Sequence, residues 1–561
     1  MSSEAAAPPR AIAVAADRLR RAHSAAVSVR PAYVLGALLV AQWLALLALA
    51  LTVRRNGWLF YAGGDQLWHY TGAYLLAHGH LGPSLVGYGW SVLLMPLAGI
   101  AGPNLLSALP GIVLFNTLVL LPVALLCVYD IAARIAGRLF GYFAAVLWIA
   151  LPYLGIVFVE PGYHQKYTEL TLPQLLGLTS VPDFPGMVAL LISAALCMRA
   201  AESGAWATTA GAGLAAGYSI GIKPSNSIFL VAPALFFLVV RWRALMWFAA
   251  GLALPLLTLA LWKYRGLGEL AAAPPEPVRS AAGVDSLLHR IHNPELNSWE
   301  HLHQVLLGLR EHFWAARVME WLPVAGCVAL LARSWRALLL IGGWFVVFLL
   351  TKGTYIPASI EDASFWRILM PAYPAYLILA ASIVLLVPGM RARPVRESTS
   401  PSWLRGRRMW IAVGAAAAVF VIFPLGVIAA TPALHDQGRI SVRVGDTQLP
   451  VSSAIAPRAT VSGDSVRLSW PDGGTANARV FYRLLRVQGS GDAACAGTPS
   501  GAADDCRVFM DLGPTTRETS LVDRPGPGTW GYRVGVAANW VDDPNLGDIY
   551  VISPPVTATV K

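Results

Sequence analysis

Long apolar runs alternate with short polar connections over most of the chain. The runs are Val34–Val53, Leu109–Tyr129, Phe140–Val159, Phe184–Met198, Trp206–Ile222, Ile228–Val240, Leu245–Trp262, Trp321–Leu331, Ala337–Leu350, Phe365–Leu386 and Trp410–Ala430. A helix needs roughly 20 apolar residues to cross the hydrocarbon core of a bilayer, and several runs approach that length. The pattern therefore predicts a polytopic α-helical membrane protein with about eleven spans.

One further apolar stretch, Tyr88–Ala101, is shorter than a usual span. If it crossed the membrane, every later connection would change sides, and the arginines at 241, 243 and 391–408 would lie outside. Its Trp90 and Pro96, with the glycines beside it, are compatible with a helix that lies at the membrane surface. We therefore predict a re-entrant or in-plane helix at the outer interface.

Arginine marks the connections on one side of the predicted spans. These residues are Arg134, Arg138, Arg199, Arg241, Arg243, Arg333, Arg336 and the arginines of residues 391–408. Because short cytoplasmic connections carry an excess of Lys and Arg, this side is predicted to be cytoplasmic. Residues 1–32 then form a cytoplasmic tail, and residues 33–431 form the transmembrane domain. The predicted outer loops are 54–108, 160–183, 263–318 and 352–364, and the C-terminus lies outside.

The pattern changes completely after the last apolar run. Alternating segments follow at Ser465–Trp470, Arg479–Val487, Gly528–Ala538 and Ile552–Val560, with Gly, Asn and Asp between them. The alternation predicts short antiparallel strands, and a stretch of roughly 120 residues suits one β-sandwich. Residues 432–561 are therefore predicted to be an extracytoplasmic all-β sandwich domain. Cys495 and Cys506 lie close together in it, so an oxidising compartment would allow a disulfide between them.

Composition agrees with the membrane class. Of the 561 residues, 56% are hydrophobic and 13% are charged, whereas about a quarter are charged in an average soluble protein. The net charge of +11 would fit a nucleic-acid partner if it were gathered in one patch. Most of the surplus arginine instead lies in short loops beside apolar runs, where it sets the orientation of the spans in the membrane. We therefore expect membrane lipids as partners and no nucleic acid.

The ionisable residues near the membrane edge gather on the predicted outer side. They are Asp65, His69, Glu160, His164, Lys166, Glu169, Asp183, Lys223, Lys352, Glu361, Asp362 and Arg367. Because such residues are costly near a bilayer, each is a candidate for function. A set with both carboxylates and cations suits a reaction between a neutral hydroxyl and an anionic, phosphate-linked donor.

Four segments, in order along the chain, resemble one known superfamily. They are GGDQLWHYTGAYLLAHGHLG with the following YGWSVLLMPLAGIAGPN, then VPDFPGMVALLI, AGAGLAAGYSIGIKPSN and FWRILMPAYPAYLILAA. They resemble the GT-C glycosyltransferases that use polyprenyl-phosphate sugars, in particular the protein mannosyltransferase and aminoarabinose transferase branches. In the C-terminal region, VRLSW with Trp470 and GTWGYRVGV with Tyr532 resemble a fibronectin type III domain. The first resemblance implies a GT-C-like membrane fold.

The resemblance also implies roles for three residues. Asp65 would be the catalytic base, and Lys223 and Arg367 would contact the donor phosphate. Each role has an alternative. Aspartate at the start of a helix commonly caps it, and lysine or arginine near the end of a span often sets orientation or extends its charge toward water. Direct displacement by an acceptor hydroxyl would invert the sugar's anomeric centre.

Five further residues are candidate substrate contacts: Asp183, His69, Glu160, His164 and Lys352. Asp183 has the alternative of capping the span that begins at Phe184. Glu160 and His164 have the alternative of being surface or supporting residues.

The sequence leaves a divalent metal open but does not support a metal site, and it indicates no other cofactor. Gln66 follows Asp65 where many members of the superfamily carry a second acidic residue, which leaves a single carboxylate. His301 and His303 are two residues apart and would face different directions on a helix, so they do not form a ligand pair.

These features predict a membrane glycosyltransferase at the outer face of a bacterial inner membrane. It would transfer a sugar from a polyprenyl-phosphate donor to a hydroxyl of an envelope glycan, lipid or protein. Because Ala, Arg and Gly are typical of GC-rich genomes, the hypothesis extends to an actinobacterial arabinose or mannose donor. Two alternatives stay open, a transporter or flippase for a lipid-linked sugar and a non-catalytic envelope scaffold. The sequence has no evident internal repeat, which disfavours the transporter.

Overall fold

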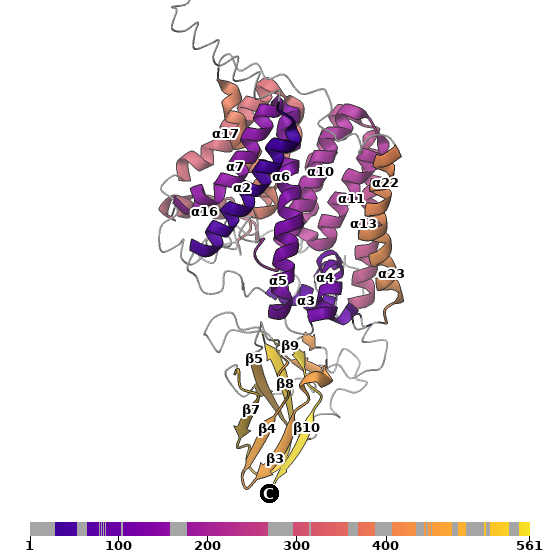
Figure 1. Ribbon diagram of the computed structural model, residues 1–561, viewed down its shortest axis with the longest axis vertical. Coiled ribbons are helices and arrows are strands. Elements are labelled where there is room, and N and C mark those ends of the chain that lie inside the picture. Colours follow the sequence, from indigo (N-terminus) through magenta and orange to yellow (C-terminus); the bar gives the residue numbers. More distant parts are fainter. Residues whose placement is uncertain are drawn as a thin grey trace, which may run out of the picture.

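Figure 1 shows a computed structural model of the chain. It describes residues 29–52, 64–77, 79, 81, 84, 86–101, 105–157, 177–267, 296–312, 316–356, 369–387, 407–432, 442–444, 447–449, 451–473, 481–489, 510–511, 516–537 and 549–561. The helices form one bundle, and the strands lie at the end of the bundle where α3, α4 and α5 are found.

Helices occupy most of the described residues up to residue 432. The α-helices are α2 (Pro31–Thr52), α3 (Gly64–Ala77), α4 (Tyr88–Ala101), α5 (Leu105–Phe115), α6 (Leu121–Ala136), α7 (Arg138–Val157), α10 (Asp183–Ser203), α11 (Trp206–Ile222), α12 (Val231–Arg241), α13 (Ala244–Leu267), α16 (Trp299–His312), α17 (Ala316–Arg333), α18 (Trp335–Ala337), α19 (Gly343–Gly353), α21 (Tyr373–Ser382), α22 (Arg407–Ala417) and α23 (Phe423–Ala430). Short π-helical turns, η1 (Asn116–Leu120), η4 (Leu338–Gly342) and η8 (Ala418–Ile422), join consecutive helices. The 3₁₀ turns are η2 (Pro224–Leu230), η5 (Met370–Ala372), η6 (Ile383–Leu386) and η10 (Ser453–Ile455).

Seven helical segments in the described ranges are long and apolar enough to cross a membrane, judged by length and composition. They are Pro31–Ala48, Ala108–Ala136, Asp183–Ser203, Pro224–Arg241, Ala244–Gly266, Trp335–Gly353 and Arg408–Ala430. The described residues of the four other predicted spans are helical too, in α7, α11, α17 and the succession η5–α21–η6. The chain is therefore a helical membrane protein, and the total of about eleven spans stays a prediction.

Helix α4 has only 14 residues, fewer than the roughly 20 that a membrane span needs. It packs against α3, and both lie at the end of the bundle beside the strands (Figure 1). Its placement in the plane of the membrane stays a prediction.

Helices α11 and α13 pack closely because glycines line their contact. A Cβ atom at Gly213 would overlap the backbone oxygen of Phe248, and one at Gly251 would overlap that of Ala210. Small residues at such contacts allow membrane helices to approach until their backbones touch. The glycine-rich sequence of α11 therefore fixes the end of this helix, where Lys223 follows, against its neighbours.

A buried charge cluster joins α6 and α10 near their C-terminal ends. Arg199 donates two hydrogen bonds to the Asp130 carboxylate, at 2.9 and 3.0 Å, and Arg134 donates another at 2.9 Å. Arg134 also pairs with Glu202. Both Asp130 and Arg134 are buried. The sequence indicated these arginines only as markers of orientation, because Asp130 and Arg199 are 69 residues apart along the chain.

The C-terminal region consists of β-sheets. Its strands are β1 (Val442–Val444), β2 (Thr447–Leu449), β3 (Arg458–Ser462), β4 (Ser465–Ser469), β5 (Phe481–Gln488), β6 (Met510–Asp511), β7 (Ser520–Asp523), β8 (Gly528–Ala537), β9 (Ile549–Ile552) and β10 (Val556–Val560). One sheet has the order β10-β8-β5-β6 with β9 also paired to β8, another has the order β3-β4-β7, and β1 pairs with β2. All strand pairs are antiparallel.

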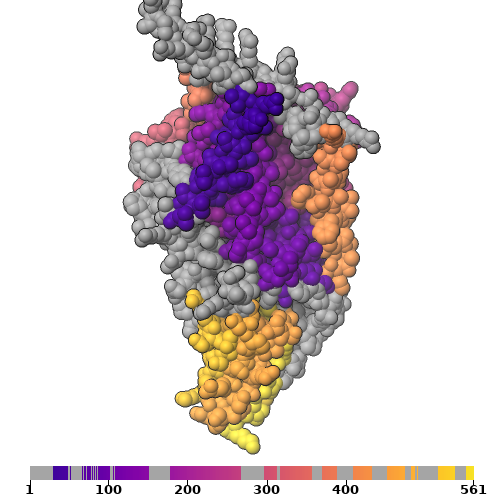
Figure 2. Space-filling view, in the orientation of Figure 1, coloured from indigo at the N-terminus to yellow at the C-terminus, as the bar shows by residue number. Residues whose placement is uncertain are grey.

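The two larger sheets share one core, to which β4, β5 and β8 contribute Leu468, Tyr482 and Val534. Three of the predicted strands match β4, β5 and β8 closely. The fourth prediction was wrong in extent, since Ile552–Val560 is not one strand: β9 ends at Ile552 and β10 begins at Val556. Pro554 and Pro555 lie between them, and proline cannot donate to a strand ladder. Figure 2 shows the strands as a lobe beyond the helical bundle.

Candidate functional site

Helix α3 carries the residue that the sequence singled out as a base. The helix begins at Gly64, so Asp65 is in its first turn. The side chain of Asp65 lies outside the described part of the structure. Acidic residues are favoured in this turn by the helix dipole whether or not they have a catalytic role, so position alone does not decide between a cap and a base.

The beginning of α3 is fastened to the segment that precedes α10. The side-chain oxygen of Gln66 accepts a hydrogen bond from the backbone N–H of Ser180 at 3.1 Å. From α4, Trp90 donates to the carbonyl of Ser180 at 2.9 Å. Since Asp183 follows three residues later, the first turn of α3 and the first turn of α10 lie at the same end of the bundle.

Asp183 and Lys223 form a buried ion pair at that end. Lys223 Nζ lies 2.7 Å from Asp183 Oδ1, and the Asp183 side chain is 0% exposed while that of Lys223 is 15% exposed. Neighbouring contacts hold the two helix ends together, because Ser219 donates to the carbonyl of Gly186 at 2.8 Å and accepts from Asn226 at 2.9 Å. The sequence suggested separate roles for the two charges, and the structure brings them together.

The loop before α4 reaches the same place. A Cβ atom at Gly87 would overlap the backbone oxygens of Gly221 and Ile222, the last two residues of α11. Tyr218 donates its hydroxyl hydrogen to the carbonyl of Gly89 at 2.8 Å. Close contact between these backbones places the start of α4 beside the residue that follows them, Lys223.

His69 lies on α3, the helix that begins at Gly64. Its side chain is buried, and its Nδ1 lies 3.3 Å from Ser91 Oγ of α4. His69 is therefore positioned by the contact between α3 and α4. Its predicted role as a substrate contact stays a prediction.

Lys352 is buried near the end of α19, and α19 packs against η2, the turn that follows Lys223. The turn η5 packs against both α10 and α19, and Arg367 precedes it by three residues. Arg367, Glu160 and His164 themselves lie outside the described residues, as do Cys495 and Cys506. Their predicted roles stay predictions.

A second lysine, Lys263, joins the loop between α3 and α4 to the end of α13. Its Nζ donates to the carbonyl of Ser84 at 2.5 Å, and Ser84 donates its hydroxyl hydrogen to the carbonyl of Trp262 at 2.7 Å. The indole of Trp262 donates to the carbonyl of Val86 at 2.9 Å. These bonds fix the loop that connects the two helices. They could not be predicted from the sequence, because the partners are far apart along the chain.

The sheet region contacts α3 directly. Strand β9 packs against this helix, the backbone N–H of Leu81 donates to the carbonyl of Pro432 at 2.9 Å, and the Ser452 hydroxyl is hydrogen-bonded to Tyr74. Burial raises the pKa of Tyr74, and the hydrogen bond from Ser452 opposes this rise. The candidate site therefore lies at the end of the bundle that the strands cover.

We expect the contact between Tyr74 and Ser452 to couple the two regions energetically. Replacing Tyr74→Phe should lower the free energy of unfolding by about 1 kcal/mol, because one partly buried hydrogen bond is lost. Ser452→Ala should cost less in the Tyr74→Phe background than in the unaltered protein, since both changes remove the bond to Tyr74, whereas the bond from the Ala454 N–H to Ser452 is lost in either background. Thermal unfolding of the two single variants and the double variant measures this coupling, with Tyr33→Phe at an exposed tyrosine of α2 as the control. Strict additivity would contradict the coupling.

The described residues contain no group of three or more His, Cys, Asp or Glu side chains that could hold a metal ion. What they do contain at the end beside the strands is one buried carboxylate–ammonium pair and one helix whose first turn carries another carboxylate. A carboxylate can accept a proton and a cation can stabilise a phosphate, so this arrangement can serve group transfer from a phosphorylated carrier.

No family model matches the chain, and no curated protein matches it at a significant level. Solved structures of the oligosaccharyltransferase of Archaeoglobus fulgidus are similar to it. The complex with zinc and sulfate is 14% identical with a TM-score of 0.38, over 70% of this chain and 52% of that chain. The AglB complex with an inhibitory peptide and a dolichol-phosphate is 13% identical with a TM-score of 0.38, over 70% and 55%. The chain thus spans about half the length of the structures it matches.

Proposed function

We propose that the protein is a GT-C-type glycosyltransferase that moves a sugar from a polyprenyl-phosphate donor to a hydroxyl group. The acceptor is a cell-envelope glycan, lipid or protein at the outer face of a bacterial inner membrane. The proposal is supported by the hydrogen bond between Gln66, in the first turn of α3, and Ser180, three residues before the Asp183 of the Asp183–Lys223 pair. More specifically, we propose that the transferred sugar is arabinose or mannose.

The proposed reaction is a single displacement. Asp65 accepts the proton of the acceptor hydroxyl while the acceptor oxygen bonds to the anomeric carbon of the sugar. The bond between that carbon and the phosphate oxygen breaks, the polyprenyl phosphate leaves, and the anomeric centre is inverted. Lys223 and Arg367 stabilise the negative charge that the phosphate gains as it leaves.

The pair with Asp183 is compatible with this role of Lys223. A lysine ammonium has three donors, and one of them is directed to Asp183 Oδ1. The carboxylate also keeps the ammonium at a defined place, which lowers the entropy lost when a phosphate binds. Asp183 would thus be a positioning residue, and His69, Lys352, Glu160 and His164 are proposed to contact the substrates.

The proposal includes a topology. The N-terminus lies in the cytoplasm and the sheet region lies outside, where Cys495 and Cys506 can form a disulfide. The sheet region would hold the acceptor next to α3, since β9 packs against that helix.

Transfer can be measured directly with purified full-length protein. Incubation with radiolabelled polyprenyl-phosphate arabinose or mannose and a panel of envelope acceptors should give a labelled, lipid-free product with the inverted anomeric configuration. In sealed proteoliposomes that carry the donor in one leaflet, movement of donor to the other leaflet without any labelled product would favour a transporter and contradict the proposal.

A further inference from the structure

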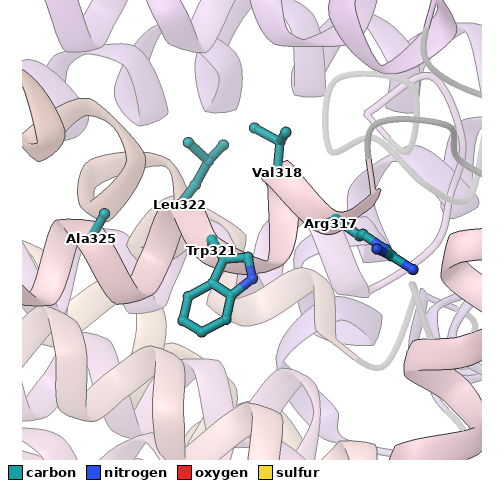
Figure 3. Close-up of a pocket in the computed structure, with 5 residues that line it drawn as sticks. All are labelled: Arg317, Val318, Trp321, Leu322 and Ala325. Atoms are coloured by element: carbon teal, nitrogen blue, oxygen red, sulfur yellow. The ribbon is translucent and has the colours of Figure 1, made fainter.

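Helix α17 carries an apolar groove on the surface of the bundle. The groove has a volume of about 320 Å³ and is lined by Arg317, Val318, Trp321, Leu322 and Ala325. Figure 3 shows Val318, Leu322 and Ala325 projecting from one side of the helix, with Trp321 on another side and Arg317 at its beginning. The spacing 318, 322, 325 follows the helical repeat, so these side chains form one continuous face.

Other apolar side chains of the same helix are exposed too. Val318, Trp321, Val324, Val328 and Leu331 are each between 49% and 67% exposed. From Arg317 to Ala325 the helix rises about 12 Å, which is most of the roughly 15 Å of one leaflet of the hydrocarbon core. A fatty acyl chain can therefore extend along Val318, Leu322 and Ala325 when Arg317 lies at headgroup level.

The charge at the beginning of the groove is not neutralised by the described residues. Glu320, one turn after Arg317, is the carboxylate best placed to pair with it on the same helix. Glu320 is instead held by Arg310 of α16, whose Nη2 lies 2.9 Å from Glu320 Oε2. Among the described residues no acidic side chain pairs with Arg317, so an anion is the complementary partner.

The groove is distinct from the candidate site. Helix α17 packs against α16, α18, η4, α21 and η6. Asp183 begins α10 and Lys223 directly follows α11, and these two helices lie on the other side of the bundle (Figure 1). One phosphate group therefore cannot contact both Lys223 and Arg317. An indole one turn from the cation, in Trp321, is typical of the membrane interface.

We propose that this groove binds an anionic glycerophospholipid of the bilayer, with one acyl chain along Val318, Leu322 and Ala325 and its phosphate on Arg317. Arg317 supplies a guanidinium whose fork matches two phosphate oxygens. The inference is independent of the proposed transferase activity, and its test needs no sugar donor.

Binding can be measured by native mass spectrometry of the full-length protein mixed with phosphatidylglycerol and phosphatidylcholine of identical acyl chains. We expect phosphatidylglycerol to be retained preferentially. Arg317→Gln should weaken its binding about tenfold through loss of a charge-assisted contact, and Ala325→Trp should do the same by filling the groove. Two controls should bind as the unaltered protein does: Leu257→Trp, at a position of α13 that is 64% exposed, and Arg243→Gln, at an exposed arginine beside Trp242.

Equal retention of the two lipids, or unchanged phosphatidylglycerol binding by Arg317→Gln, would show only unspecific boundary lipid and would overturn the proposal. Competition gives a second test. If undecaprenyl phosphate displaced phosphatidylglycerol from the unaltered protein and lost this ability in Ala325→Trp, the groove would belong to a polyprenyl lipid, and the assignment to a glycerophospholipid would be wrong.

Discussion

Replacing Asp65→Asn is expected to lower the rate of sugar transfer about 10²- to 10⁴-fold, the usual contribution of a general base. Asparagine has nearly the same shape but cannot accept the proton of the acceptor hydroxyl. Asp65 is in the first turn of α3, and its neighbour Gln66 is fixed to Ser180. The substitution should therefore leave the backbone in place, so that the loss appears in the rate at saturating donor rather than in folding.

Two further variants make this expectation specific. Asp65→Glu restores a carboxylate at a slightly different place and should recover part of the rate. Asp464→Asn, at an exposed aspartate in the turn between β3 and β4, should have no effect. The thermal unfolding midpoint is measured for all three. Near-normal transfer by correctly folded Asp65→Asn protein would exclude the base and leave the first-turn aspartate a structural role through the helix dipole.

Much of the architecture follows from patterns that are local in the sequence. The long apolar runs predicted helices because a buried helix needs apolar side chains all round, as in α10, where 15 of the 21 residues are buried. The alternation of apolar and polar residues at Ser465–Trp470 predicted β4, because successive side chains of a strand point to opposite faces of the sheet. The error at residues 552–560 came from reading the alternation across Pro554 and Pro555, which interrupt the ladder.

Contacts between distant segments were not predictable in this way. Asp130 was not singled out, because only the packing of α6 against α10 brings it to Arg199. The same holds for Lys263, which appears in the sequence as a charge at the end of an apolar run and in the structure as a donor to the carbonyl of Ser84. A charge pattern along the chain indicates which side of the membrane a residue occupies, but it does not indicate its partner.

The candidate site includes features that local sequence patterns predicted and a contact between distant segments that they did not. The sequence placed Asp183 and Lys223 on the same side and left open whether each had a structural or a chemical role. The structure adds an interpretation that neither residue suggested alone, a buried ion pair that joins the start of α10 to the end of α11. A structural role for this pair and a role of Lys223 toward a donor phosphate predict different outcomes when the pair is removed in two steps.

Replacing Lys223→Met should lower the free energy of unfolding by about 3–5 kcal/mol, because it removes the cation that pairs with the fully buried Asp183 carboxylate. The double variant Lys223→Met with Asp183→Asn removes both charges and should recover most of that loss, as thermal unfolding would show. Additive destabilisation would contradict the pair.

The same double variant separates structure from chemistry. If Lys223 stabilises the leaving phosphate, the double variant should be folded and stable and still transfer sugar at least about tenfold more slowly, since one charge-assisted contact is lost in the transition state. Lys223→Arg keeps a cation and should retain more activity than Lys223→Met. If the double variant regained the full rate together with its stability, the pair would only hold α10 and α11 together, and the phosphate contact would have to come from other residues, with Arg367 the first to examine.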